Sequence, residues 1–189
     1  MKIWKGYVRL GPLKGNFHAG CIMKESFDAA LKQVLKYEGG KVDDPRDPGG
    51  RTAFGVTQDT YNAWRKKQGL PNADVFSISQ ADVAAIYRQE YWDRIRGDDL
   101  PAGVDFAVFD FAVNSGVVKA AKTLQGVVGV VQDGQIGPAT IQATKAYVGL
   151  AVTNKRLAFM QSLSIWSTFG KGWSARIAAV KAQVLALVS

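Results

Sequence analysis

The residues best suited to chemistry lie in one stretch, which begins at Glu38 and continues as a loop rich in aspartate, proline and glycine. Two glycines follow Glu38, and the loop after them carries Asp43, Asp44 and Asp47. A carboxyl group at a helix end, facing a loop with further carboxyl groups, is an arrangement that can cleave a glycosidic bond. The stretch therefore predicts acid–base chemistry performed by carboxyl groups.

Glu38 occupies an unusual place for a structural glutamate. Residues 25–38 have the apolar spacing of an amphipathic helix, and Glu38 lies four residues after Val34 and seven after Leu31, on the apolar stripe. It also falls in the last expected helical turn, where the macrodipole disfavours negative charge by roughly 0.3–1 kcal/mol. Both features favour the protonated carboxyl that a general acid needs. The alternative is a surface glutamate on a frayed turn beside a glycine cap.

The order of residues after Glu38 is distinctive. Glu-Gly-Gly is followed by Asp-Pro-Arg-Asp-Pro-Gly-Gly at 44–50, then by Thr52 and by Gly-Val-Thr at 55–57. This pattern resembles glycoside hydrolase family 108, which contains phage-type endolysins and N-acetylmuramidases of lysozyme-like fold, some of them labelled secretion activators. The resemblance implies that Glu38 is the catalytic acid. The family pattern usually reads Ala-Thr-Asn after the glycine pair, whereas this chain reads Arg-Thr-Ala at 51–53.

Composition limits the classes of partner. The chain has 189 residues, of which 47% are hydrophobic and 21% charged, as in ordinary soluble globular proteins. No apolar run approaches the roughly 20 residues of a membrane span. The net charge of +8 suggests a polyanionic partner such as cell-wall polymer, nucleic acid or a membrane surface. Nucleic acid is disfavoured for two reasons. Half of the net charge lies in residues 1–22, which hold four basic residues and no acid, and elsewhere Lys and Arg do not cluster on one helix.

Residues 1–23 are expected to be a leader, a tag or a misassigned start, because they are basic, broken by glycines and lack the apolar core of a signal peptide. The only histidine and the only cysteine, His18 and Cys21, lie there. The rest of the chain therefore has no Ser-His-Asp or Cys-His nucleophile system and no His/Cys zinc site. We expect no metal and no cofactor.

The sequence pattern predicts a mainly α fold with about seven or eight helices and at most a small β-hairpin near 51–57. The family resemblance implies that this fold is lysozyme-like. Ser26 and Ser79 are the expected N-caps of two helices. The segment 102–115 is apolar nearly all round, which predicts the central buried helix. The expected helices span 25–38, 58–68, 80–94, 102–115, 117–128, 138–148, 151–166 and 173–187.

A second motif lies further along the chain. Leu124-Gln125 is followed at 133–140 by Asp-Gly-Gln-Ile-Gly-Pro-Ala-Thr, which resembles a peptidoglycan-binding module. Asp-Gly favours a tight turn, and Pro138 is suited to the first position of a helix, so the alternative is a loop that only turns the chain. The segment 169–176 also matches the C-terminal part of the family. We therefore expect a lysozyme-like catalytic lobe at 24–104 and a helical lobe containing the module at 105–189, packed as one compact unit.

The second carboxylate is expected in the loop. Asp47 is the best candidate because the Pro-Gly-Gly after it can hold it across a cleft, and Asp43 and Asp44 come next. Thr52 and Gln58 are expected to position water or an N-acetyl group. Whether the carboxyl separation is that of a retaining or an inverting enzyme stays open.

Four further residues are candidates for substrate contact. Tyr91 and Trp92 are aromatic residues that usually belong to a core, with sugar stacking as the alternative; a Tyr-Trp pair recurs here in the resembling family. Asp110 and Asn114 lie four residues apart on one face of the central helix. They predict either an internal hydrogen-bonded pair or polar groups lining the cleft opposite Glu38.

Glu90 is the other glutamate on an apolar stripe. It lies four residues after Ile86, and Arg94 stands four residues after it. The Glu-Arg spacing favours an ion pair along the helix over a catalytic role.

Together these features predict a hydrolase that cleaves the β-1,4 bond between N-acetylmuramic acid and N-acetylglucosamine in peptidoglycan glycan strands. Two alternatives are a lytic transglycosylase that uses the same Glu38 and a non-catalytic peptidoglycan-binding or secretion-helper protein. With no recognisable signal peptide, the protein is expected to be made in the cytoplasm and to act on the cell wall, in the periplasm or outside, after release or export. Oligomeric state, export route and wall type stay open.

Overall fold

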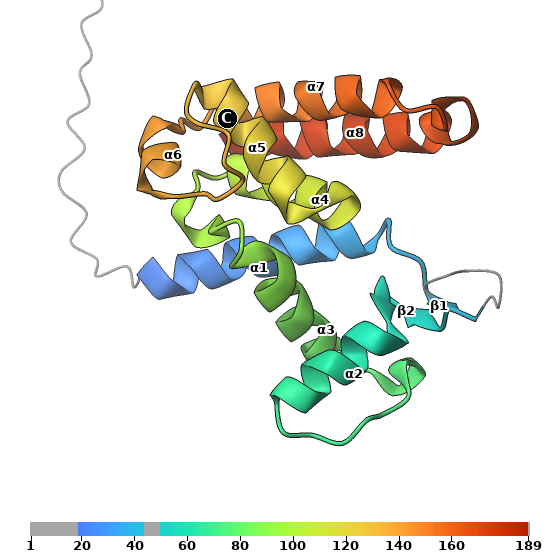
Figure 1. Ribbon diagram of the computed structural model, residues 1–189. Helices are drawn as coiled ribbons and strands as arrows, with labels where there is room; N and C mark the ends of the chain where they lie inside the picture. Colours follow the sequence, from blue (N-terminus) through green and yellow to red (C-terminus); the bar gives the residue numbers. More distant parts are fainter. Residues whose placement is uncertain (1–18, 44–49, 189) are drawn as a thin grey trace, which may run out of the picture.

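The computed structural model describes residues 19–43 and 50–188. Figure 1 shows α1 (Ala19–Leu35) running across the molecule between two groups of elements. Below it lie α2 (Gln58–Lys67) and three short strands, and α3 (Gln80–Tyr87) leads up from them. Above it lie α4 (Val104–Ser115), α5 (Val117–Val128), α6 (Pro138–Ala143), α7 (Val148–Gln161) and α8 (Trp166–Val188).

The fold is mainly helical, as predicted, and its sheet is small. The strands β1 (Lys41–Val42), β2 (Thr52–Ala53) and β3 (Val56–Thr57) pair antiparallel in the order β1-β2-β3. The hairpin of β2 and β3 was expected, but β1 was not, because two exposed residues after Glu38 carry no strand pattern. Lys41 faces Ala53 across the first pair, so the chain just after Glu38 is tied to the hairpin.

The central helix is the predicted one. Every residue of α4 from Val104 to Ala112 is buried, and α4 packs against α1, α5, α7 and α8. Phe27 of α1, Phe109 of α4 and Trp92 meet edge to face, with ring centroids 5.3–6.0 Å apart. Such pairs contribute about 0.5–1.5 kcal/mol each beyond the area they bury. A single apolar core thus extends from α1 to α8.

Helix ends differ from the expected ones where tertiary contacts intervene. Ser26 lies inside α1 instead of capping it, because its hydroxyl donates to the buried Asp105 at 2.5 Å. Ser79 does cap α3, accepting from the amide of Asp82. The helix expected at 80–94 changes after Tyr87 into a π-helical turn, η2 (Arg88–Trp92). Such turns occur often at functional sites.

The later helices shift in the same way. α6 ends at Ala143 rather than 148, because Thr144 leaves the helix and its hydroxyl bonds back to the carbonyl of Thr140. α7 begins at Val148 and α8 at Trp166, each earlier than expected. Two short 3₁₀ turns, η1 (Val75–Ser77) and η3 (Gly97–Asp99), complete the described elements. Among the described residues, no helix has both the length and the apolar character to cross a membrane.

Candidate active site

Glu38 lies just beyond the helix that leads to it. α1 ends at Leu35, and the amide of Tyr37 donates to the carbonyl of Val34 at 3.0 Å, so the chain closes into a tighter turn. Glu38 follows in a bend and its side chain is 22% exposed. The expected position in the last helical turn is therefore wrong by one turn, although the side chain is half-buried.

An arginine from the other end of the chain contacts Glu38. Nη1 of Arg176, in α8, donates to Oε1 of Glu38 at 3.1 Å. The same guanidinium donates through Nη2 and Nε to Oδ1 of Asp110, in α4, at 2.8 and 3.0 Å. Arg156, in α7, donates to the other oxygen of Asp110. Glu38, Asp110, Arg156 and Arg176 form one network, which we call the charged cluster.

The charged cluster is buried except at Glu38. Asp110, Arg156 and Arg176 are at most 7% exposed, and two arginines face two carboxyl groups. Burial lowers the pKa of Arg156 despite the nearby Asp110. Burial would also lower the pKa of Arg176, but the charges of Asp110 and Glu38 outweigh it and raise that pKa. Both arginines remain cations at any pH at which the fold persists.

The second oxygen of Glu38 faces the hairpin. Phe54 and Gly55 have φ angles of 51° and 75° at the turn between β2 and β3. A Cβ on Gly55 would lie 3.1 Å from Oε2 of Glu38 and 2.4 Å from the hydroxyl of Tyr87, so only glycine fits here. The Tyr87 hydroxyl donates to the carbonyl of Phe54 at 2.9 Å. Burial, with the nearby Glu38 charge, raises the pKa of Tyr87, which keeps it a donor.

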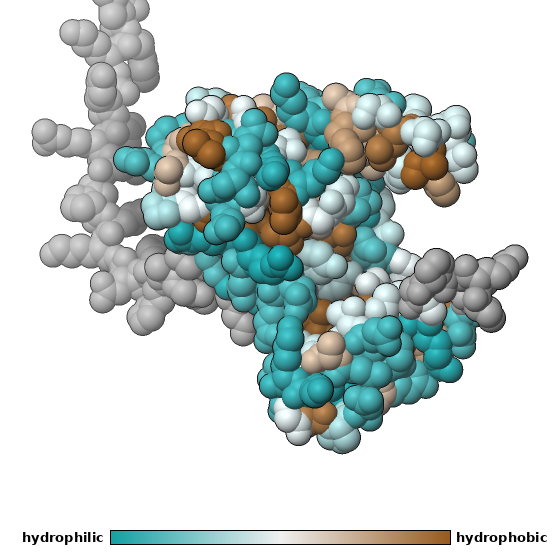
Figure 2. Space-filling view, viewed as in Figure 1, coloured by the Kyte–Doolittle hydropathy of each residue, from teal (hydrophilic) through white to brown (hydrophobic). Residues whose placement is uncertain are grey.

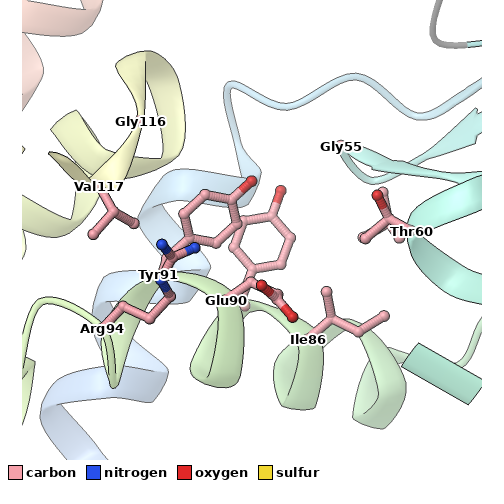
Figure 3. Close-up of a pocket in the computed structure, with 10 residues that line it drawn as sticks. Gly55, Thr60, Ile86, Glu90, Tyr91, Arg94, Gly116 and Val117 are labelled. Carbon is pink, nitrogen blue, oxygen red and sulfur yellow. The ribbon is translucent and has the colours of Figure 1, made fainter. Parts of the chain in front are cut away.

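A pocket of about 250 Å³ adjoins this turn, and we call it the cleft. Its wall includes Gly55, Thr60, Ile86, Glu90, Tyr91 and Arg94. Figure 3 shows Tyr91 and Glu90 rising from the same turn, with Thr60 and Gly55 on the opposite side. Figure 2 shows a separate hollow of the surface, between α7 and α8 above and the part with the strands below, and no residue of α7 or α8 lines the cleft. Because Gly55 lines the cleft and faces Oε2 of Glu38, the Glu38 carboxyl lies beside the cleft.

Glu90 takes a different partner from the expected one. Its carboxylate accepts from Lys67 of α2 at 3.1 Å, and the expected pair with Arg94 is not formed. Burial raises the pKa of Tyr91, and the charges of Glu38 and Glu90 raise it further. Two carboxyl groups therefore act on one phenol in the cleft wall. Glu90 is a site candidate that its sequence spacing had assigned to an ion pair along the helix.

Several predicted contacts have structural roles. Trp92 is completely buried and its indole donates to Asp98 at 2.8 Å, so it has no ring face on which a sugar can stack. The Gln58 amide donates to the carbonyl of Ala73 at 2.7 Å and accepts from the amide of Val75 at 2.9 Å, which ties α2 to η1. The side-chain amide of Gln58 is used in these bonds because α2 and η1 meet at this point.

The remaining predicted residues divide between the site and its surroundings. Asn114 is exposed and accepts from the Ser115 hydroxyl, so the hydrogen-bonded pair with Asp110, one of the two alternatives, is not formed. The arginines of α7 and α8 bind Asp110 instead, and neither Asp110 nor Asn114 lines the cleft. The Thr52 hydroxyl donates to the carbonyl of Gly50 at 3.2 Å. Asp43 lies 3.5 Å from Arg51.

Two of the loop aspartates cannot be placed. Asp47, the candidate for the second carboxylate, and Asp44 lie outside the described residues.

Comparison with known proteins places this geometry in a family. The model of the family described as "Glycosyl hydrolase 108" matches residues 31–116. The solved structure titled "Structure of Brucella abortus SagA" is 43% identical, covers 87% of this chain and 96% of that chain, and superposes with a TM-score of 0.72. The chain belongs to the glycosyl hydrolase 108 family. A search among curated proteins found no match.

The glycosyl hydrolase 108 match contains Glu38, the hairpin, the cleft wall except Val117, and Asp110, but neither arginine of the charged cluster. Sequence reasoning missed both arginines, although a signal was present. Arg176 stands four residues before Val180 and eight before Val184, and all three are buried on one face of α8. A charged residue at a core position of a helix predicts a buried partner.

The motif that resembles a peptidoglycan-binding module forms a closed turn. The Gln125 amide donates to Asp133 at 2.6 Å and to the carbonyl of Gln135 at 2.9 Å, and it accepts from the amide of Gly134 at 2.9 Å. Gly134 has a φ of 84°, and Pro138 begins α6 as expected. The polar groups of the motif are used on one another. A wall-binding role for this segment stays a prediction.

Proposed function

We propose that this protein is a peptidoglycan hydrolase that cleaves the β-1,4 bond between N-acetylmuramic acid and N-acetylglucosamine, with Glu38 as the general acid. The observation that carries the proposal is the half-buried Glu38 carboxyl, fixed by Arg176 beside a cleft, in a chain of the glycosyl hydrolase 108 family. The specific bond and the role of Glu38 are our inferences. Family membership supports the hydrolase chemistry.

In the proposed reaction Glu38 donates its proton to the glycosidic oxygen as the bond from that oxygen to C1 breaks. Water then supplies a hydroxyl group to C1. In one route a second carboxylate takes the proton of the attacking water; in the other it first bonds to C1 in a glycosyl-enzyme intermediate, and Glu38, now deprotonated, takes the proton of the water that breaks that bond. The two routes differ in carboxyl separation, about 6.5–9.5 Å for the first and about 5–5.5 Å for the second.

The second carboxylate has two candidates. Asp47 remains the prediction from the loop sequence. Glu90 is the candidate from the cleft wall, and its charge, like that of Glu38, raises the pKa of the Tyr91 hydroxyl. Asp47→Asn and Glu90→Gln distinguish them: the variant that loses most of its kcat identifies the group, and full activity in one removes that candidate.

The substrate class follows from the family and the charge. A basic protein with a net charge of +8 is attracted to an anionic wall polymer. We therefore propose that it acts on peptidoglycan glycan strands outside the cytoplasmic membrane.

The test uses purified peptidoglycan and compares the wild type with Glu38→Gln. We expect the wild type to release fragments with reducing muramic acid ends and the variant to release none while its circular dichroism spectrum is unchanged. Anhydro-muramic ends would instead identify a lytic transglycosylase, in which the sugar's own hydroxyl attacks. Binding to the wall with no release by the wild type would contradict any catalytic role.

A further inference from the structure

The charged cluster behind Glu38 serves a purpose that acid catalysis by itself does not explain. We propose that Arg176 is a positioning residue that fixes the Glu38 carboxyl and determines which of its oxygens carries the proton. This inference rests on the proposed role of Glu38 as general acid. It also makes the C-terminal helices, which lie outside the family match, part of the active site.

The contacts of Arg176 leave it little freedom. Its guanidinium donates to Glu38 from Nη1 and to Asp110 from Nη2 and Nε. The planar group thus spans two carboxyl groups at once, a geometry that lysine cannot reproduce. The ring of Tyr37 lies 5.3 Å from its Cζ and covers one side.

Asp110 is itself fixed from the other side. Arg156 donates to its second oxygen, so both oxygens of Asp110 bind arginines that come from different helices. The Asp110 carboxylate therefore cannot rotate without breaking a buried ion pair. Because Arg176 binds this fixed carboxylate, its guanidinium is held in one orientation, and it holds the Glu38 carboxyl in place in turn.

Stability is a weak explanation for this cluster. Replacing buried ion networks by apolar groups of similar size is often neutral or stabilising, because the charges must be taken out of water. Here Nε and Nη2 of Arg156 are buried without a hydrogen-bond partner among the described residues, which adds to the cost. An arrangement that costs this much is better explained by the orientation it gives to the site.

Glu38 needs such orientation because its own backbone gives little. It lies in a bend after α1 and is followed by two exposed glycines, Gly39 and Gly40. Arg176 binds Oε1, while Oε2 lies against Gly55, which lines the cleft. A guanidinium hydrogen bond makes Oε1 the less basic oxygen, so the proton is favoured on Oε2, which faces the cleft and donates to the substrate. Misplacing a catalytic group by about 1 Å can cost about a hundredfold in rate.

The test compares Arg176→Lys, Arg176→Gln and the control Lys171→Gln on purified peptidoglycan. Lys171 is exposed on the same helix, so the control removes a positive charge from α8 away from the cluster. We expect Arg176→Lys to keep its KM within about twofold and to lose about 10–100-fold in kcat, since the charge stays and the fork is lost. Lys171→Gln should keep the wild-type kcat and KM.

The split between kcat and KM separates positioning from a merely structural role. Arg176→Gln, which loses both the charge and the fork, should lose at least as much kcat as Arg176→Lys while its KM stays within about twofold of the wild type. Loss of stability alone would lower kcat only in proportion to the folded fraction. Each variant is assayed at a temperature at which circular dichroism shows it folded.

A second variant covers the case in which changes at Arg176 prevent folding. Asp110→Asn with Arg156→Met removes one charge of each sign, so the remaining pair stays balanced while Arg176 loses its support. It should show the same loss of kcat with an unchanged KM.

The outcomes separate the two proposals. If folded Arg176→Lys or the double variant keeps the wild-type kcat while Glu38→Gln is inactive, Arg176 has no positioning role. If Glu38→Gln retains wild-type hydrolysis, the proposed function itself is contradicted.

Discussion

Two polar networks with buried centres, both among the described residues, differ in how far along the chain they reach. The turn around Gln125 joins residues at most 15 positions apart and contains no ion pair to a distant element. The charged cluster joins Glu38 to Arg176 across 138 positions and Asp110 to Arg156 across 46. Both contain a residue from a recognisable sequence motif, yet they are built in opposite ways.

The difference lies in what each network leaves available. In the turn, hydrogen bonds from the Gln135 amide and the Gln125 side chain lower the pKa of Asp133, and these bonds close the network on itself. In the charged cluster, Glu38 keeps one oxygen beside the cleft while the other is bound. A network that is satisfied internally stabilises a turn, whereas one with a free edge at a cleft can act on a ligand.

Asp110→Ala tests the charged cluster most severely. Removing this carboxylate leaves two buried arginines facing one half-buried glutamate, which should lower the free energy of unfolding by about 3–5 kcal/mol. Urea denaturation followed by circular dichroism measures the change. Asn114→Ala, one helical turn away and exposed, is the control and should stay within about 0.5 kcal/mol of the wild type. A loss below 1 kcal/mol for Asp110→Ala would contradict the cluster as described.

Gly55→Ala affects the boundary between the cluster and the cleft. The new Cβ would meet the Tyr87 hydroxyl and Glu38 at a positive φ, so the hairpin must shift at a cost of about 1–3 kcal/mol and kcat should fall. Gly129→Ala is the matched control, because it has a φ of 77° with open space around it. The control should lose stability from backbone strain and keep full activity. Equal activity in both variants would show that Glu38 does not depend on this contact.

Gln125→Ala removes the centre of the local turn. The buried amide of Gly134 loses its acceptor, which should cost about 1–3 kcal/mol of unfolding free energy, and the exposed Asp133 and Gln135 lose the bonds that Gln125 donates to them. Because no residue of this turn touches the cleft, kcat on peptidoglycan should stay at the wild-type value. A loss of kcat larger than the loss of folded protein would mean that the turn contributes directly to the reaction.

Asp105 is a buried carboxyl with no cation partner in the described part of the chain, and it gives a pH-dependent contrast to Asp110. Burial raises its pKa, with hydrogen bonds from the Ser26 hydroxyl and the Phe106 amide opposing the shift. A raised folded-state pKa means that its contribution to stability is present below the unfolded value of 3.8 and is lost as pH rises through the folded value.

Asp105→Asn should therefore stabilise the protein slightly at neutral pH, with the gain disappearing towards pH 3.8. Thermal melts of the variant and the wild type across this range measure it. A gain that is the same at both ends of the range would show that Asp105 does not titrate with folding.

The sequence predicts the parts of the fold that local pattern determines. The apolar periodicity of 102–115 identified the central helix, and Ser79 and Pro138 marked helix starts correctly. The prediction that Ser26 caps a helix was wrong because its hydroxyl donates to Asp105, 79 positions away, and not to a group at the helix end. Such partners are set by tertiary packing, which overrides local preference.

The site was predictable in the same measure. Glu38 stood out because a carboxyl group on an apolar stripe needs an explanation, and because the glycine pair that follows it is visible in the local sequence. Arg176 and Tyr87 could not be paired with it, since those contacts exist only after α1, α3 and α8 meet. Trp92 was ambiguous because the same residue type suits a core and a sugar platform, and only packing decides between them.

The central claim is that the Glu38 carboxyl protonates the glycosidic oxygen, and product analysis on purified peptidoglycan tests it most directly. We predict that wild-type protein releases fragments with reducing muramic acid ends and that folded Glu38→Gln releases none above background. Wild-type amounts of those fragments from the folded variant would contradict the claim.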